Sequence, residues 1–148
     1  MSYVSLDTGV IAEYIDVAGS LHKEAEAIIR NVLGGKLLAI IPHPILVETY
    51  YVSARIYERL GLSDPEERAE KLIEWLYRSP NFSLAEPSLE LAILAGKIKR
   101  KFGLAFTDAY VLASAKLYGG KALFRSKEKE IVKRFNAITV EYDVAFLQ

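Results

Sequence analysis

The sequence has 148 residues, of which 51% are apolar and 26% charged, with a formal net charge of zero. This length and composition are typical of globular proteins, and we expect residues 1–148 to form a single domain. The lack of cysteine excludes a disulfide framework and a thiolate metal site. No signal-peptide pattern opens the sequence and its apolar runs are too short to span a bilayer, so we expect a cytoplasmic protein without membrane contact.

Predicted strands and helices alternate along the chain. The first part is predicted to contain a strand at 3–6, helices at 10–15 and 21–33, a strand at 36–41 and helices at 44–60 and 66–78. The second part is predicted to contain strands at 82–85, 121–125 and 137–142 and helices at 88–102, 107–118 and 127–135. This alternation predicts an α/β fold, a three-layer α/β/α sandwich with a central, mainly parallel sheet.

Charge is unevenly distributed along the sequence. Residues 97–134 carry 11 basic and 3 acidic side chains, a local charge of +8, whereas residues 1–96 carry a local charge of −6. A basic segment of this kind is typical of a surface that faces a polyanion, although two solvated helix faces would give the same count.

Acidic side chains follow several of the predicted strands. Asp7 comes directly after the first strand, and Glu128 and Glu130 follow the strand before the last. Glu48 lies two helical turns beyond the second strand, and Asp108 opens a helix. Ligands of open α/β sheets gather outside the carboxyl ends of the strands, so we expect at least three of these acids to meet in one crevice.

Each acid also has a purely structural interpretation. Asp7 can form a turn within Asp-Thr-Gly, and Asp108 can complement the helix dipole behind a Thr107 cap. Ile45, Val52 and Ile56 form an apolar stripe at helical spacing, and Glu48 occupies a position between them, where an ionised carboxylate needs a salt bridge or a metal ion. These structural interpretations stay open for each residue. However, the expected occurrence of several acidic residues at one sheet edge favours a ligand that they share.

A hard divalent cation is the ligand that best neutralises several carboxylates. Oxygen donors favour Mg²⁺ or Mn²⁺, and a chain with two histidines and no cysteine is a poor candidate for a zinc site. A carboxylate-held Mg²⁺ beside a basic surface suits phosphodiester chemistry, because the metal activates water and stabilises charge on phosphate oxygens. His43, at the start of the Glu48 helix, is a further candidate for substrate contact.

Four stretches carry the acids: VSLDTGVI at 4–11, PHPILVETYY at 42–51, GLAFTDAYVLASA at 103–115 and ALFRSKEKEI at 122–131. In this order and spacing they resemble the motifs of the PIN-domain family of metal-dependent ribonucleases, many of which are toxins of VapBC-type toxin–antitoxin pairs. The resemblance spans nearly the whole chain. It implies a PIN-like fold and Mg²⁺ (or Mn²⁺) as cofactor, with Asp7, Glu48 and Asp108 as catalytic residues and metal ligands.

The chain departs from the family at the fourth motif, which in the family reads Thr-x-Asp-x-Asp-Phe. The corresponding residues 126–131 read SKEKEI, so glutamate replaces both aspartates and its extra methylene moves each carboxylate outward. By resemblance, Glu128 joins the catalytic set, Glu130 joins the metal ligands, and Thr107 and Ser126 support the acidic site. Whether one or two metal ions bind stays open.

The leading hypothesis is an endoribonuclease that hydrolyses RNA phosphodiester bonds through a metal-activated water. The resemblance implies products with a 5′-phosphate and a 3′-hydroxyl. Basic side chains predicted to gather the RNA backbone are Lys99, Arg100, Lys101, Arg125 and Lys127.

Partners also follow from the resemblance, which implies a homodimer inhibited by a small antitoxin protein. Tyr50, Tyr51 and Tyr57 are candidates for the dimer face, because tyrosine is common at interfaces. The alternatives are a non-catalytic PIN-like module that binds RNA or protein, a housekeeping RNA-processing nuclease, and a phosphatase or phosphoacceptor domain on a similar sheet.

Overall fold

Five parallel strands form the central sheet of the computed structural model, which describes residues 2–127 and 129–148. The strand order is β3-β2-β1-β4-β5. The strands are β1 (Ser2–Leu6), β2 (Leu37–Pro42), β3 (Phe82–Ala85), β4 (Lys121–Phe124) and β5 (Val144–Phe146). The predicted α/β fold is confirmed, and the sheet is parallel throughout.

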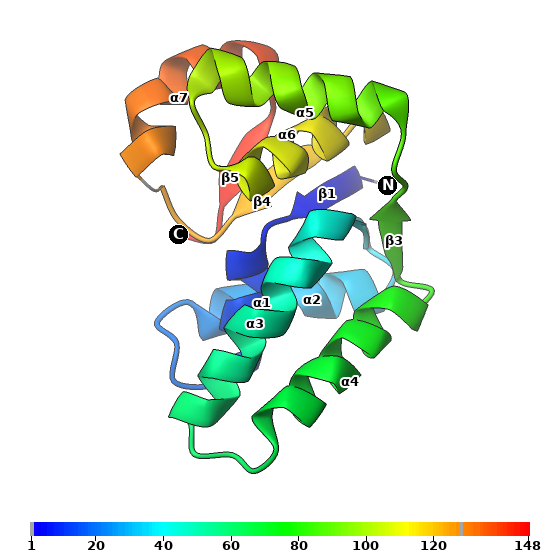
Figure 1. Ribbon diagram of the computed structural model, residues 1–148, viewed down its shortest axis with the longest axis vertical. Coiled ribbons are helices and arrows are strands. Elements are labelled where there is room, and N and C mark those ends of the chain that lie inside the picture. Colours follow the sequence, from blue (N-terminus) through cyan, green and yellow to red (C-terminus); the bar gives the residue numbers. More distant parts are fainter. Residues whose placement is uncertain (1, 128) are drawn as a thin grey trace.

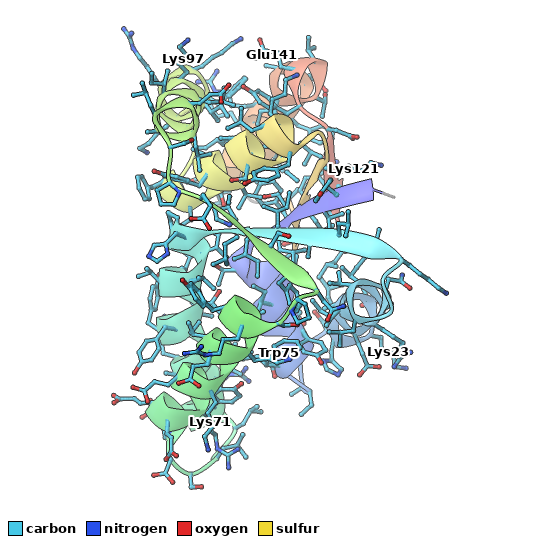
Figure 2. All side chains as sticks on the ribbon, turned by 90° about the vertical axis from the view of Figure 1, so that its right-hand side faces the viewer. Lys23, Lys71, Trp75, Lys97, Lys121 and Glu141 are labelled. Carbon is cyan, nitrogen blue, oxygen red and sulfur yellow. The ribbon has the colours of Figure 1, made fainter. Side chains whose placement is uncertain are left out.

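Helices cover both faces of the sheet and complete the three layers (Figure 1). One layer contains α1 (Thr8–Ile15), α2 (His22–Leu33), α3 (His43–Arg59) and α4 (Pro65–Arg78). The other contains α5 (Leu89–Phe102), α6 (Phe106–Tyr118) and α7 (Lys129–Glu141). Figure 2 shows the same division, with Lys23 and Lys71 in the first layer and Lys97 and Glu141 in the second. In the part of the chain that the structure describes, no helix has the length and apolar character needed to cross a membrane.

The handedness of the crossovers explains why the helices divide in this way. The chain moves outward from β1 through β2 to β3, then returns to the other side of β1 and continues through β4 to β5. Because β-α-β crossovers are right-handed, reversing the direction of travel moves the helices to the opposite face. The reversal lies between β1 and β4, and ligands of such sheets bind outside the carboxyl ends of the strands at this point.

Buried apolar side chains fill the space between the layers. Leu6 of β1 and Ile40 of β2 are fully buried, as expected for parallel strands that are covered on both faces. The Trp75 ring of α4 packs 5.2 Å from the Phe82 ring and 6.2 Å from the Tyr14 ring, measured between centroids, and ties α4 to β3 and α1 (Figure 2). Helix α6 contacts β1, β2 and β4, and its small residues, such as Ala113, allow a close approach to the sheet.

The strand predicted at 137–142 is wrong. The preceding helix continues to Glu141, and β5 begins only at Val144. The β-branched run from Ile138 to Val140 favours a strand locally. However, Ile138 lies seven residues after Ile131, on the same helix face, and burial of both side chains against the core overrides the local preference.

Candidate active site

Asp7 stands at the reversal point of the sheet, directly after β1. Its backbone N–H donates to the Leu123 carbonyl oxygen of β4 (3.1 Å), so pairing of the two strands extends to this residue. Its carboxylate caps α1, accepting the N–H of Gly9 at Oδ2 (3.3 Å). The half-buried Asp7 is therefore held from both sides at the carboxyl edge of the sheet.

Asp108 lies in the first turn of α6 and is 7% exposed. Helix α6 runs antiparallel to β1, and its far end is fixed by the contact of the Tyr118 ring with the Tyr3 ring, 6.2 Å between centroids. From Tyr3 to Asp7 the strand advances about 13 Å, and from Tyr118 back to Asp108 the helix advances about 15 Å. Asp7 and Asp108 therefore stand at the same level, at the carboxyl edge of the sheet.

Glu48 approaches this edge from α3. Its Oε2 accepts a long hydrogen bond from the Thr107 hydroxyl (3.5 Å), which links α3 to the first turn of α6 next to Asp108. The expected cap role of Thr107 is wrong, because α6 begins one residue earlier, with Ala105 at the cap position. The Thr107 hydroxyl instead donates to Glu48, the acidic residue of the second motif.

The apolar stripe on α3 differs from the one that the sequence predicts. Its buried side chains are Ile45, Leu46, Thr49 and Ser53, and Glu48 lies beside this stripe, half-exposed. The premise that Glu48 occupies a dry core position is wrong. A half-exposed carboxylate at the edge of the core remains accessible to a ligand.

Arg125 and Ser126 follow β4 and flank Asp7. Arg125 donates from Nη1 to the Ser126 hydroxyl oxygen (3.3 Å) and from Nε to Glu13 Oε1 (2.6 Å). A Cβ atom at Gly9 would lie 2.7 Å from the Arg125 Cβ and 3.3 Å from Asp7 Oδ2. The absence of a side chain at Gly9 thus allows Arg125 to pass close to Asp7.

Glu13 was missed by the sequence analysis, although it contacts a predicted site residue. It is 5% exposed on α1 and accepts the Arg125 guanidinium and, at Oε2, the backbone N–H of Leu21 (3.1 Å). The available signal was a single acid within the otherwise apolar stretch VIAEYI at 10–15. An acid inside such a stretch needs a buried partner.

The other basic candidates lie elsewhere, three of them in the last turn of α5, where positive charge complements the helix dipole. Lys99 Nζ donates to the Leu104 carbonyl oxygen (2.8 Å), and Lys101 pairs with Glu141. Arg100 is exposed. These contacts fix the end of α5 beside α7 and the loop that leads into α6.

The segment after β4 contributes exposed charges. Lys127 Nζ lies 4.2 Å from the centroid of the Phe135 ring, a cation–π contact with α7. Glu130 is exposed in the first turn of α7. Glu128, predicted to be catalytic, lies outside the described residues.

His43 follows β2 and is exposed at the same edge. It lines a cavity of about 190 Å³ together with Pro44, Leu91 and Tyr110. Tyr110 lies two residues beyond Asp108 on α6, and side chains two residues apart on a helix do not share a face. The cavity that His43 lines therefore lies on another side of α6 from Asp108, and the contact of His43 with a substrate stays a prediction.

The donor chemistry of the acidic residues fits a hard cation. Within residues 2–127 and 129–148, no group of three or more His, Cys, Asp or Glu side chains is already arranged to hold a metal ion. Asp7, Glu48 and Asp108 nevertheless offer carboxylate oxygens without sulfur or imidazole, from three elements that end or begin at one edge. Such a set suits Mg²⁺ or Mn²⁺ rather than zinc.

Comparison with known families identifies the fold. The model of the PIN domain family matches residues 4–134. The chain belongs to the PIN domain family. The match covers the four stretches that carry the acids, so the resemblance seen in the sequence is confirmed. No curated protein matches the sequence at a significant level.

Solved structures share this PIN fold. The VapC20 toxin of Mycobacterium tuberculosis, described as cleaving the sarcin-ricin loop, is 16% identical over 80% of this chain and 86% of its own, with a TM-score of 0.63. VapBC-1 of nontypeable Haemophilus influenzae is 16% identical over 98% of both chains, with a TM-score of 0.57. FitAcB of Neisseria gonorrhoeae is 17% identical over 97% of both chains, with a TM-score of 0.53. At these identities the likeness concerns the fold.

Proposed function

We propose that this PIN domain is a Mg²⁺- or Mn²⁺-dependent endoribonuclease. The observation that carries the proposal is that Asp7 follows β1 at the reversal point of the sheet, while the Thr107–Glu48 hydrogen bond brings α3 to the first turn of α6, which carries Asp108. Membership of the PIN family and the fold shared with an RNA-cleaving toxin support it. Hydrolysis of a phosphodiester bond is a reaction that a carboxylate-held divalent cation can support.

In this proposal, Asp7, Glu48 and Asp108 hold the cation, and Glu130 and Glu128 complete the acidic site. When bound, the cation activates a water molecule and neutralises charge on the phosphate oxygens. The chain positions its acids beforehand: Gly9 fixes the Asp7 carboxylate, and the Thr107 hydroxyl fixes Glu48.

In this proposal, the RNA backbone is held by one basic side chain beside Asp7 and by others that lie farther from the acids. Arg125, supported by Ser126, lies beside Asp7. Lys99, Arg100 and Lys101 at the end of α5, and Lys127 after β4, extend the positive surface. The proposed hydrolysis would break the P–O3′ bond: the water oxygen would stay on phosphorus, giving a 5′-phosphate, and a proton from that water would go to O3′, giving a 3′-hydroxyl.

Cleavage of a labelled RNA pool with Mn²⁺ or Mg²⁺ tests the proposal. We expect Asp7→Asn and Asp108→Asn to lower the cleavage rate at least about a hundredfold, since each removes one ligand charge from the site. Asp143→Asn is the matched control, because Asp143 is exposed and precedes β5 at the opposite edge of the sheet. Cleavage that persists in EDTA, or in both site variants, would refute the proposal.

We further propose that the chain is the toxin of a toxin–antitoxin pair that acts in the cytoplasm. The support is the shared fold with VapC20 and with VapBC-1. Induction of the chain in a bacterial host should arrest growth, whereas the Asp108→Asn variant should not. Growth that continues with active, cleaving protein would favour a housekeeping nuclease.

A homodimer and a small antitoxin are the proposed partners. Exposed apolar side chains on three neighbouring helices support an interface: Val47 and Tyr51 on α3, Leu89 and Ile93 on α5, and Phe106 on α6. Apolar side chains gathered in this way mark interaction surfaces. Structural relatives solved as toxin–antitoxin complexes support the antitoxin.

The second candidate is a PIN module that binds RNA and does not cleave it. Glutamate in place of both aspartates of the fourth motif favours it. Binding to RNA without cleavage in Mn²⁺ across a broad RNA pool would select this candidate over the nuclease.

A further inference from the structure

Glu13 and Arg125 form an ion pair in which the acidic partner is buried. The Glu13 side chain is 7% exposed and the Arg125 side chain 43% exposed, and the Nε–Oε1 distance is 2.6 Å. The second carboxylate oxygen of Glu13 accepts the N–H of Leu21. An ionised carboxylate tolerates such burial when its oxygens are paired. Glu13 is therefore a fixed support from which the arginine projects.

The Arg125 side chain begins close to Asp7 and extends along α1 to Glu13. Its Cβ lies 2.7 Å from the position that a Cβ at Gly9 would occupy, and Asp7 Oδ2 lies 3.3 Å from the same position. The Nε–H group of the Arg125 guanidinium donates to Glu13 Oε1 on α1. An arginine has five N–H donors in a planar fork, and phosphate oxygens match that geometry.

We propose that Glu13 is a positioning residue that holds Arg125 for contact with an RNA phosphate next to Asp7. The inference rests on the proposed ribonuclease function and adds two specific roles. Arg125 contacts the substrate backbone at the acidic site, rather than contributing to a general positive surface. Glu13 never touches RNA; it acts by limiting the side-chain conformations of Arg125 before the substrate binds.

The direction in which Glu13→Gln changes RNA affinity distinguishes a positioning role from a general electrostatic effect. Glu13→Gln removes a negative charge, so a general electrostatic effect predicts tighter RNA binding. Loss of positioning predicts weaker binding, because Arg125 must then be ordered by the substrate. The structural alternative, in which the pair only pins the α1–α2 loop to β4, predicts lower thermal stability with unchanged RNA affinity of the folded protein.

Binding of a fluorescently labelled single-stranded RNA, measured by anisotropy in EDTA over a range of salt concentrations, provides the test. We expect Arg125→Gln to weaken binding about tenfold and to reduce the slope of log K against log salt by about 0.7, as for one lost phosphate contact. Glu13→Gln should weaken binding as well, and should have no further effect when Arg125 is already glutamine.

Lys121→Gln is the matched control, since Lys121 is exposed at the opposite end of the same strand (Figure 2). If Glu13→Gln fails to fold, Arg125→Lys replaces it: the charge is kept but the planar fork is lost, and binding should still weaken. The inference is overturned if Glu13→Gln or Arg125→Lys binds RNA as tightly as the wild type. It is also overturned if Arg125→Gln behaves like Lys121→Gln.

Measuring binding in EDTA keeps this test separate from that of the proposed function. A wild type that binds RNA but does not cleave it in Mn²⁺ would refute the nuclease and leave the Arg125 contact to be judged by affinity alone. If the wild type cleaves RNA in Mn²⁺ and Glu13→Gln binds RNA as tightly as the wild type, only the positioning role of Glu13 is refuted.

Discussion

Asp108 allows the proposed metal site to be tested by thermal unfolding, without an RNA substrate. A cation that binds only the folded chain stabilises it by about 2.7 kcal/mol when its concentration is 100 times the dissociation constant. The entropy of unfolding is about 2.1 cal/mol/K per residue, so 148 residues give about 0.3 kcal/mol/K. The expected rise in the melting temperature is about 9 °C.

Asp108→Asn should remove most of this rise, because it deletes one charged oxygen ligand from a position that is 7% exposed. If Asp108 only complements the dipole of α6, the variant should instead lose about 0.3–1 kcal/mol of unfolding free energy, which lowers its melting temperature by about 1–3 °C, and the loss should be the same with and without the cation. Differential scanning calorimetry in EDTA and in saturating Mn²⁺ gives both values. Equal cation-dependent shifts in Asp108→Asn, Asp143→Asn and the wild type would refute the reasoning.

Three further predictions concern packing, ionisation and assembly. Gly120→Ala should lower the free energy of unfolding by about 1–3 kcal/mol, because a Cβ there would lie 2.6 Å from the Tyr3 Cβ; an unchanged urea midpoint would contradict this. Burial raises the pKa of Tyr57 above its ordinary value of 10.0, so folding stability from this group is lost as the pH rises through the raised pKa; Tyr57→Phe should remove one of the steps that titrate above the ordinary tyrosine pKa from the absorbance titration of the folded protein. Val47→Glu should shift a homodimer toward monomer in light scattering, and no shift would place the interface elsewhere.

The acidic candidates could be chosen from the sequence because a short apolar strand ends immediately before Asp7 and Asp108 lies in the first turn of a small-residue helix. The alternation of strands and helices implies a parallel sheet whose strands end at one edge, which the strand pairing confirms; the meeting of the acids at that edge stays a prediction. Their exact environment could not be predicted. Burial of Glu48 depends on how α3 is rotated against β2, and three residues on a helix face do not fix that rotation.

Glu13 shows a different limit. Its partner Arg125 lies 112 residues away in the sequence, and no local pattern reveals such a pairing. The mistaken strand at 137–142 has the same origin, since burial of Ile138 against distant residues decided the conformation of its neighbours. Local preference located the elements, whereas tertiary contacts determined their ends and their polar partners.

The central position of β1 has a consequence for synthesis of the protein. Asp7 is synthesised long before its partners, because its backbone is fixed by Leu123 of β4, and Arg125 follows Leu123 in the sequence. A nascent chain without residues 121–124 leaves one side of β1 unpaired. The acidic edge therefore cannot assemble until residues 121–124 have been translated, more than a hundred residues after Asp7, so the proposed site stays incomplete while the chain between them is being made.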